Sequence, residues 1–261
     1  MDGEAKAESI FEFLTARNPD VHYRAPKSLS LTTLRKSYYP TQLKIWDEFR
    51  FSTLETIYNS SLMTEARRKD RSFSYPAVLA EIDDVVHDEP TTTHVLTIWN
   101  HRIVATALQA VQETLHPSIW VPSARKGQDE ADAKTTGAST HKRKTAISAR
   151  FKPDAGAVSF CQNCCPDVER LPKDYKPASK WQSSAIFDGW MAGPAGEWTP
   201  GQAGHPTAKP IRQVYTYCVE FGCRYGCIIT TQEAFIFRIK PRTKMPGGCG
   251  CFYAETVSQT S

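Results

Sequence analysis

The chain has 261 residues, of which 40% are hydrophobic and 11% aromatic, and it carries a formal net charge of +4. This composition excludes a wholly disordered chain and can supply one good-sized core, with room for a small additional subdomain. The mildly basic balance permits a polyanionic partner without requiring one. No run of 18 apolar residues is present, and acidic residues stand where a secretory signal would be basic. We therefore expect an intracellular protein, nuclear or cytoplasmic, with no membrane partner and with its eight cysteines reduced.

The first third of the chain shows short helical patterns between polar, proline-containing stretches. The patterns AESIFEFLTA and YPAVLAEIDDVV predict two short helices. We interpret residues 1–93 as a mainly helical and irregular accessory region. A longer amphipathic pattern at 94–115 then predicts a helix, and Pro117 marks its end.

The character of the sequence changes after residue 122. Residues 123–146 have almost no large apolar side chains, which predicts a mobile loop. Beyond this loop we expect extended chain in ISARFKPDAGAVSF and VERLPKDYK, a helix in AKPIRQVYTYCVEFG that ends at Gly222, and a hairpin from YGCIITT and EAFIFRI. The order predicts an α/β domain over 94–245, with a mixed sheet flanked by helices, followed by a C-terminal tail at 246–261.

Two aspartates and a lysine lie near the ends of the two predicted strands that follow the loop. Pro153-Asp154 begins one strand, and Asp174-x-Lys176 ends the other. Side chains two residues apart on an extended chain point to the same side, so those of Asp174 and Lys176 are predicted to lie on the same side of the strand. Two carboxylates can hold a hard divalent cation, and the lysine can orient water and offset negative charge on a phosphate. A surface turn with an ion pair is the alternative interpretation of these three residues.

The helix predicted after these strands carries a further polar pair. Gln213 and Tyr217 are four residues apart, so they share one face of the helix. An amide and a phenol on that face could lie beside the carboxylates and contact a phosphate or a base. In the alternative interpretation, Tyr217 belongs to the core and Gln213 to the solvated edge of the helix.

The ordered set Pro153-Asp154, Asp174-x-Lys176 and Gln213-x-x-x-Tyr217 resembles the PD-(D/E)XK nuclease superfamily, especially its RecB-like and lambda-exonuclease-like branch with a QxxxY helix. The chain is most similar to fungal PD-(D/E)XK nuclease-like proteins, through KPASKW at 176–181 and RYGCIITTQEAFIFRI at 224–239. The resemblance covers roughly residues 94–240.

This resemblance implies a restriction-endonuclease-like core and cleavage of nucleic acid that depends on Mg²⁺ or Mn²⁺. Asp154 and Asp174 would be metal ligands, Lys176 the catalytic lysine, and Gln213 and Tyr217 the helix residues of the active site. DNA is favoured over RNA as the partner. The alternative is a catalytically weakened or inactive module that binds nucleic acid or a protein.

One position departs from the pattern of the active relatives, which usually offer another acid from the helix before the sheet. In the similar fungal sequences we expect this acid three positions before a Trp-Asn pair. Trp99-Asn100 is present here, but the position is Leu96. Glu113, further along the same predicted helix, is a candidate substitute.

Basic residues near the motif strands favour a nucleic-acid partner, although charged runs are often only solvated faces. Lys180, Lys152 and Arg150 are the candidate contacts to the phosphate backbone. The cysteines Cys161, Cys164 and Cys165 lie close together and are a candidate zinc or iron–sulfur site, although their spacing fits no complete zinc-finger pattern. Packing as small apolar thiols is the favoured interpretation of the other cysteines.

Overall fold

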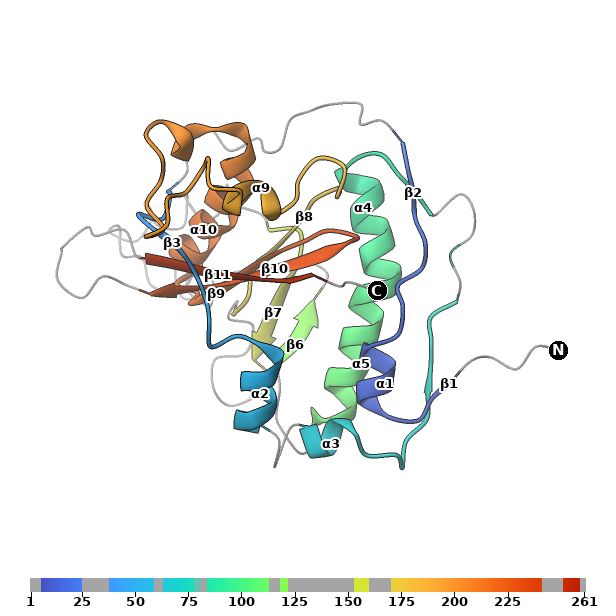
Figure 1. Ribbon diagram of the computed structural model, residues 1–261. Coiled ribbons are helices and arrows are strands. Elements are labelled where there is room, and N and C mark those ends of the chain that lie inside the picture. Colours follow the sequence, from blue (N-terminus) through green and yellow to red (C-terminus); the bar gives the residue numbers. More distant parts are fainter. Residues whose placement is uncertain are drawn as a thin grey trace, which may run out of the picture.

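A computed structural model describes residues 6–24, 38–58, 63–77, 79, 84–112, 118–121, 153–159, 170–240 and 251–258. Helices and strands are mixed along the chain, and the strands gather at the centre of the molecule (Figure 1). The α/β class expected from the order of patterns is therefore confirmed. No helix within these ranges is both long and apolar enough to cross a membrane.

The largest sheet has five strands in the spatial order β3-β11-β10-β9-β8. Strands β8 and β9 are parallel, β9, β10 and β11 are successively antiparallel, and β11 is parallel to β3. The β9–β10 pair is the hairpin predicted from its β-branched and aromatic residues. The bounds are β3 Leu43–Ile45, β8 Lys173–Tyr175, β9 Tyr225–Ile229, β10 Glu233–Lys240 and β11 Cys251–Ser258.

A second strand pair continues this sheet beyond β8. Strands β6 (Ser118–Val121) and β7 (Gly156–Ser159) are antiparallel. Ala155, just before β7, forms an antiparallel bridge with Lys173 of β8, with backbone hydrogen bonds of 2.9 and 3.3 Å. The start of β7 is thereby fixed against β8.

Helix α10 (Lys209–Phe221) ends where the sequence predicted, because Gly222 adopts a left-handed conformation with φ of 67°. Its apolar face packs on the sheet. The core it forms with β9 and β10 is built from Ile211, Val214, Tyr215, Tyr217, Cys218, Ile228, Phe235 and Phe237. Polar side chains on the same face of α10 therefore also lie against the sheet.

The helix predicted at 94–115 begins earlier in the structure. It consists of α4 (Glu89–Leu96), a π-helical turn η2 (Thr97–His101) and α5 (Arg102–Ala110), which form one column beside the sheet in Figure 1. Leu96 packs with Cys227 and Ile229 of β9, whereas Ile228 faces α10. Because neighbouring strand residues point to opposite faces, α4 and α10 cover opposite faces of the sheet.

The N-terminal region is built into the rest of the molecule. Helix α1 (Ile10–Leu14), predicted from its apolar spacing, packs through Phe13 in one core cluster with Trp99 of η2 and Ile103 of α5. Strand β3 supplies an edge of the five-stranded sheet.

The other elements of the N-terminal region are β1 Lys6–Ala7, β2 His22–Tyr23, α2 Phe51–Tyr58, α3 Thr64–Ala66, β4 Phe73–Ser74 and β5 Val85–Val86. Short helices α9 (Ser184–Phe187), η3 (Gln202–Gly204) and η4 (Pro206–Ala208) lie between β8 and α10.

Two expectations need correction. Residues 75–86 were expected to form a helix, but Val85 and Val86 pair with β2 as a parallel strand. The C-terminal tail expected at 246–261 contains β11, which lies between β10 and β3. Both segments are stabilised by pairing with distant strands, which their local patterns do not reveal. The loop expected at 123–146 lies outside the described residues.

Candidate active site

Asp174 and Lys176 lie at the end of β8, and both are almost fully buried, with exposed fractions of 0% and 1%. The Nζ atom of Lys176 is 2.7 Å from Oδ2 of Asp174. The two side chains therefore share one side of the strand end, as the two-residue spacing predicts. Their contact is a buried ion pair, not the solvated surface pair of the alternative interpretation.

Asp154 reaches the same strand end from the segment just before β7. The backbone N–H of Tyr175 donates a 2.7 Å hydrogen bond to Oδ2 of Asp154. The bridge between Ala155 and Lys173 aligns the two segments so that this bond can form. The two aspartates of the predicted motif are thus brought together although 20 residues separate them.

Gln213 and Tyr217 approach Asp174 from α10. The Nε2 group of Gln213 donates to Oδ1 of Asp174 at 3.0 Å and to the Tyr217 hydroxyl at 2.7 Å. Both side chains are buried, with 8% and 3% exposed. They hold the carboxylate of Asp174 in place from inside the protein, and burial leaves Tyr217 little surface for a substrate.

A further acid, Glu89, was missed by the sequence analysis. Its Oε2 atom is 2.8 Å from Nζ of Lys176, and 41% of its side chain is exposed. Leu96, where an acid was sought, is 1% exposed and belongs to the core. Glu113 lies outside the described residues. The helix before the sheet therefore supplies an acid one residue after its N-cap and not at position 96.

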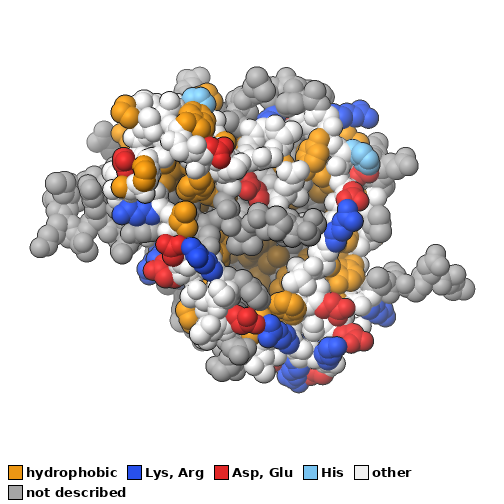
Figure 2. Space-filling model, viewed as in Figure 1, with side chains coloured by type: hydrophobic (Ala, Val, Ile, Leu, Met, Phe, Trp, Pro, Cys, Tyr) orange, Lys and Arg blue, Asp and Glu red, His pale blue; other side chains and the backbone are white. Residues whose placement is uncertain are grey.

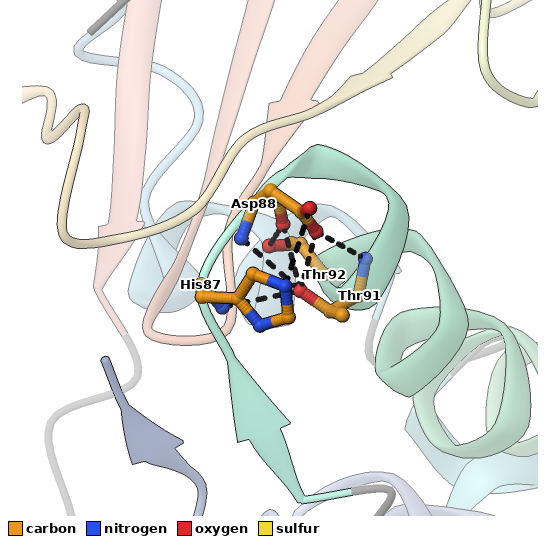
Figure 3. Close-up of polar contacts among 4 residues, drawn as sticks. All are labelled: His87, Asp88, Thr91 and Thr92. Carbon is orange, nitrogen blue, oxygen red and sulfur yellow. Dashed lines mark hydrogen bonds and ion pairs between the residues drawn. The ribbon is translucent and has the colours of Figure 1, made fainter. Parts of the chain in front are cut away.

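The start of α4 is fixed by a capping box, drawn in Figure 3. The Asp88 side chain accepts a 3.0 Å bond from the N–H of Thr91, and the Thr91 hydroxyl accepts a 3.1 Å bond from the N–H of Asp88. His87 and Thr92 add bonds to the same turn. Glu89 is thereby held in the first helical turn, where the helix dipole favours a carboxylate. Asp88-Glu89-Pro90 was the available signal, because an N-cap acid followed by proline marks a helix start.

The charges of this cluster do not balance. Three carboxylates, from Glu89, Asp154 and Asp174, surround the one ammonium of Lys176, so negative charge exceeds positive charge by two when all four are ionised. Burial raises the pKa of Asp174 well above its ordinary value, although the charge of Lys176 opposes this. Burial also raises the pKa of Asp154, despite the hydrogen bond from Tyr175. The cluster therefore favours additional positive charge.

Lys176 is held in its charged form. Burial would lower the pKa of its amine, but Asp174 and Glu89 together raise that pKa above its ordinary value. At neutral pH the side chain is an ammonium group that can offset negative charge on a bound phosphate. In this arrangement it is not a base that could take a proton from water.

Asp154 and Asp174 are the residues of the cluster that could hold a metal. Magnesium usually binds to one or two carboxylates and keeps its other positions for water and phosphate. Within the described ranges, no three His, Cys, Asp or Glu side chains gather around a common point as ligands. Glu89 contacts Lys176, and its charge also acts on both aspartates, so the two aspartates are the carboxylates that could hold a cation through oxygen.

The remaining predicted contacts are only partly visible. Lys180 is partly exposed, while Lys152 and Arg150 lie outside the described residues, as do Cys161, Cys164 and Cys165. Cys218, Cys223 and Cys227 are buried thiols, in keeping with packing. Figure 2 shows lysine and arginine side chains interspersed with aspartate and glutamate on the face in view, without a large basic patch.

Comparisons with known proteins found no match among family models, curated proteins or solved structures.

Proposed function

We propose that the protein is a metal-dependent nuclease that hydrolyses phosphodiester bonds of nucleic acid, with DNA as the favoured substrate. The observation that carries this proposal is the meeting of Asp154, Asp174 and Lys176 at one strand end. These are the residue types that hold Mg²⁺ or Mn²⁺ and stabilise negative charge on phosphorus. With all four groups ionised, the two excess negative charges of the cluster would match one divalent cation.

The side chains would divide the work as follows. A divalent cation held by Asp154 and Asp174 would polarise the phosphate and lower the pKa of water. Lys176, kept as an ammonium by its acidic neighbours, would stabilise charge on the phosphate oxygens. Gln213 would keep Oδ1 of Asp174 engaged, which leaves Oδ2 to face Lys176. The partly exposed Glu89 marks the side from which substrate would enter.

The order of elements supports a restriction-endonuclease-like core as the finer fold. Helices α4 and α5 precede three strands, β6 to β8, which run antiparallel to one another; α10 follows, and then β9 parallel to β8. A mixed sheet with a helix on each face is the arrangement that the motif resemblance implies.

Cleavage assays test the proposal. In magnesium, the protein should nick supercoiled plasmid or shorten a single-stranded oligonucleotide. Asp174→Asn and Lys176→Ala should each reduce the rate by about 100-fold or more. Asp20→Asn and Lys69→Ala, at side chains 80% and 75% exposed, are the matched controls and should keep the rate. Cleavage that survives both site substitutions would contradict the assignment.

Metal binding has an independent measurement. Manganese should raise the melting temperature of the wild-type protein, because a ligand that binds only the folded state stabilises it. At a concentration 100 times the dissociation constant, this stabilisation is about 2.7 kcal/mol. Asp154→Asn and Asp174→Asn should remove most of this shift, whereas Asp20→Asn should retain it.

A second function is favoured by the ion pairs of Lys176. Its ammonium lies within 2.8 Å of both Asp174 and Glu89, so these acids are stabilised without a metal. A non-catalytic module that binds nucleic acid or a protein could keep this arrangement. Nucleic-acid binding without cleavage and without a manganese shift would favour this second function.

A further inference from the structure

Tyr23 is linked to the same end of the sheet as the candidate active site. On β2 it pairs with Val86, three residues before Glu89. Its hydroxyl contacts the Thr231 hydroxyl at 2.5 Å, across 208 residues of sequence. Thr231 lies in the turn that joins β9 to β10, two residues after Ile229, and the Ile229 carbonyl accepts a 3.0 Å bond from the N–H of Lys176. Tyr23 is therefore connected to the site through its strand partner Val86, near Glu89, and through Thr231, near the partner of Lys176.

Tyr23 is exposed although its hydroxyl has a partner. The residue is 38% exposed, and its hydroxyl contacts that of Thr231. Because Thr231 engages the hydroxyl, the ring is the part on which another planar group can stack. Base–aromatic stacking contributes about 1–3 kcal/mol per base and requires no particular base.

Two exposed amide side chains, those of Gln232 and Gln182, are connected to Thr231. Gln232 follows Thr231 directly, and the Nε2 group of Gln182 donates to its Oε1 at 3.3 Å. This contact leaves Oε1 of Gln182 as an acceptor and Nε2 of Gln232 as a donor. An adjacent acceptor and donor match the edge of a nucleobase, whereas a phosphate would call for cationic side chains.

We infer that Tyr23, Gln182 and Gln232 form a binding site for an unpaired nucleobase next to the scissile phosphate. Bases within a duplex are stacked on one another, so this site selects single-stranded or frayed nucleic acid. The position of this site next to a cleaved phosphate rests on the proposed nuclease function. The binding of a base does not depend on cleavage.

Binding without cleavage tests this inference. The probe is a fluorescently labelled single-stranded oligodeoxynucleotide, with the same sequence as a duplex for comparison, and anisotropy is measured in EDTA. Tyr23→Ala should weaken single-strand binding about tenfold and leave duplex binding nearly unchanged. Tyr23→Phe should recover most of the loss. Tyr225→Ala is the matched control, because Tyr225 is also 38% exposed but begins β9, at the other end of that strand.

Each outcome bears on one of the two proposals. If the protein binds single strands through Tyr23 but does not cleave them, the base site is supported and the proposed nuclease function is contradicted. Three outcomes would overturn the base site even if cleavage is observed. They are an unchanged single-strand affinity in Tyr23→Ala, an equal loss of affinity for the single-stranded and duplex probes, and no single-strand binding by the wild type. Thr231→Val removes the same hydroxyl contact and keeps the ring, so weakening in this variant equal to that in Tyr23→Ala would also overturn it.

Discussion

At the scale of single residues, Lys176 is the centre of the candidate site. Its ammonium meets Asp174 inside the protein and Glu89 at the surface, so one side chain connects the sheet to the start of α4. Desolvation of these charges is compensated only while the partners remain together. The proposed function and local stability therefore depend on the same contact.

Replacing Lys176 with methionine should destabilise the fold by about 3–5 kcal/mol, because Asp174 would be left as a buried charge without its main counterion. Urea unfolding followed by circular dichroism measures the change. Lys69→Met, at a side chain that is 75% exposed, should change stability by less than about 0.5 kcal/mol. A loss below about 1 kcal/mol in Lys176→Met would contradict a buried ion pair at this position.

Asp154 should respond in the opposite direction. Its folded-state pKa is raised by burial, so its contribution to stability is greatest below its ordinary pKa and is lost as pH rises through the raised value. Asp154→Asn keeps an acceptor for the N–H of Tyr175 and removes the charge. We expect this variant to be more stable at pH 7 by about 1 kcal/mol, with the difference disappearing near pH 3. A gain that is equal at both pH values would exclude the titration of Asp154 as its cause.

At the scale of elements, local periodicity predicted what lies within one strand or helix. Alternation placed Asp174 and Lys176 on one side of β8, and helical spacing placed Gln213 beside Tyr217 on α10. The start of α4 was misplaced because the apolar pattern begins near residue 94, whereas the cap begins at Asp88. Glu89 was not predicted as a site residue because it lies before the predicted helix start and its partner, Lys176, is 87 residues away.

The cap of α4 can be tested directly. Asp88→Ala removes the acceptor for the N–H of Thr91 and should cost about 1 kcal/mol of stability. Asp88→Asn keeps an acceptor and should cost much less. Urea titrations compare the two. Because Glu89 would lose its fixed position, the alanine variant should also reduce cleavage, and equal stability of both variants would argue against the cap.

At the scale of the whole molecule, pairing between distant segments completes the sheet. Strand β11 lies between β10 and β3, so segments far apart in the sequence contribute neighbouring strands. The local patterns of short β3 and of β11 do not indicate which strands they pair with. Such long-range contacts are selected by the entire core, which explains why the α/β class could be predicted and the strand order could not.

Truncation after Lys240 should therefore damage more than a tail. Loss of β11 would leave β10 with an open edge and remove the strand partner of β3, whose Leu43 is in the core. We expect the melting temperature to fall by at least about 10 °C, or cooperative unfolding to disappear, as monitored by circular dichroism. Removing only residues 259–261 is the control and should leave melting unchanged. A long truncation that melts like the full chain would show that β11 is dispensable.

The π-helical turn between α4 and α5 lets one column serve two cores. Leu96 and Ile103 are seven residues apart, nearly two α-helical turns, and would share a face in a regular helix. Instead Leu96 packs against the sheet, and Ile103 packs against α1. The wider turn accommodates about one extra residue, equivalent to a rotation of about 100°. A single-residue deletion within 97–101 would therefore rotate the half of the column that carries Glu89 relative to the half that packs on the N-terminal core.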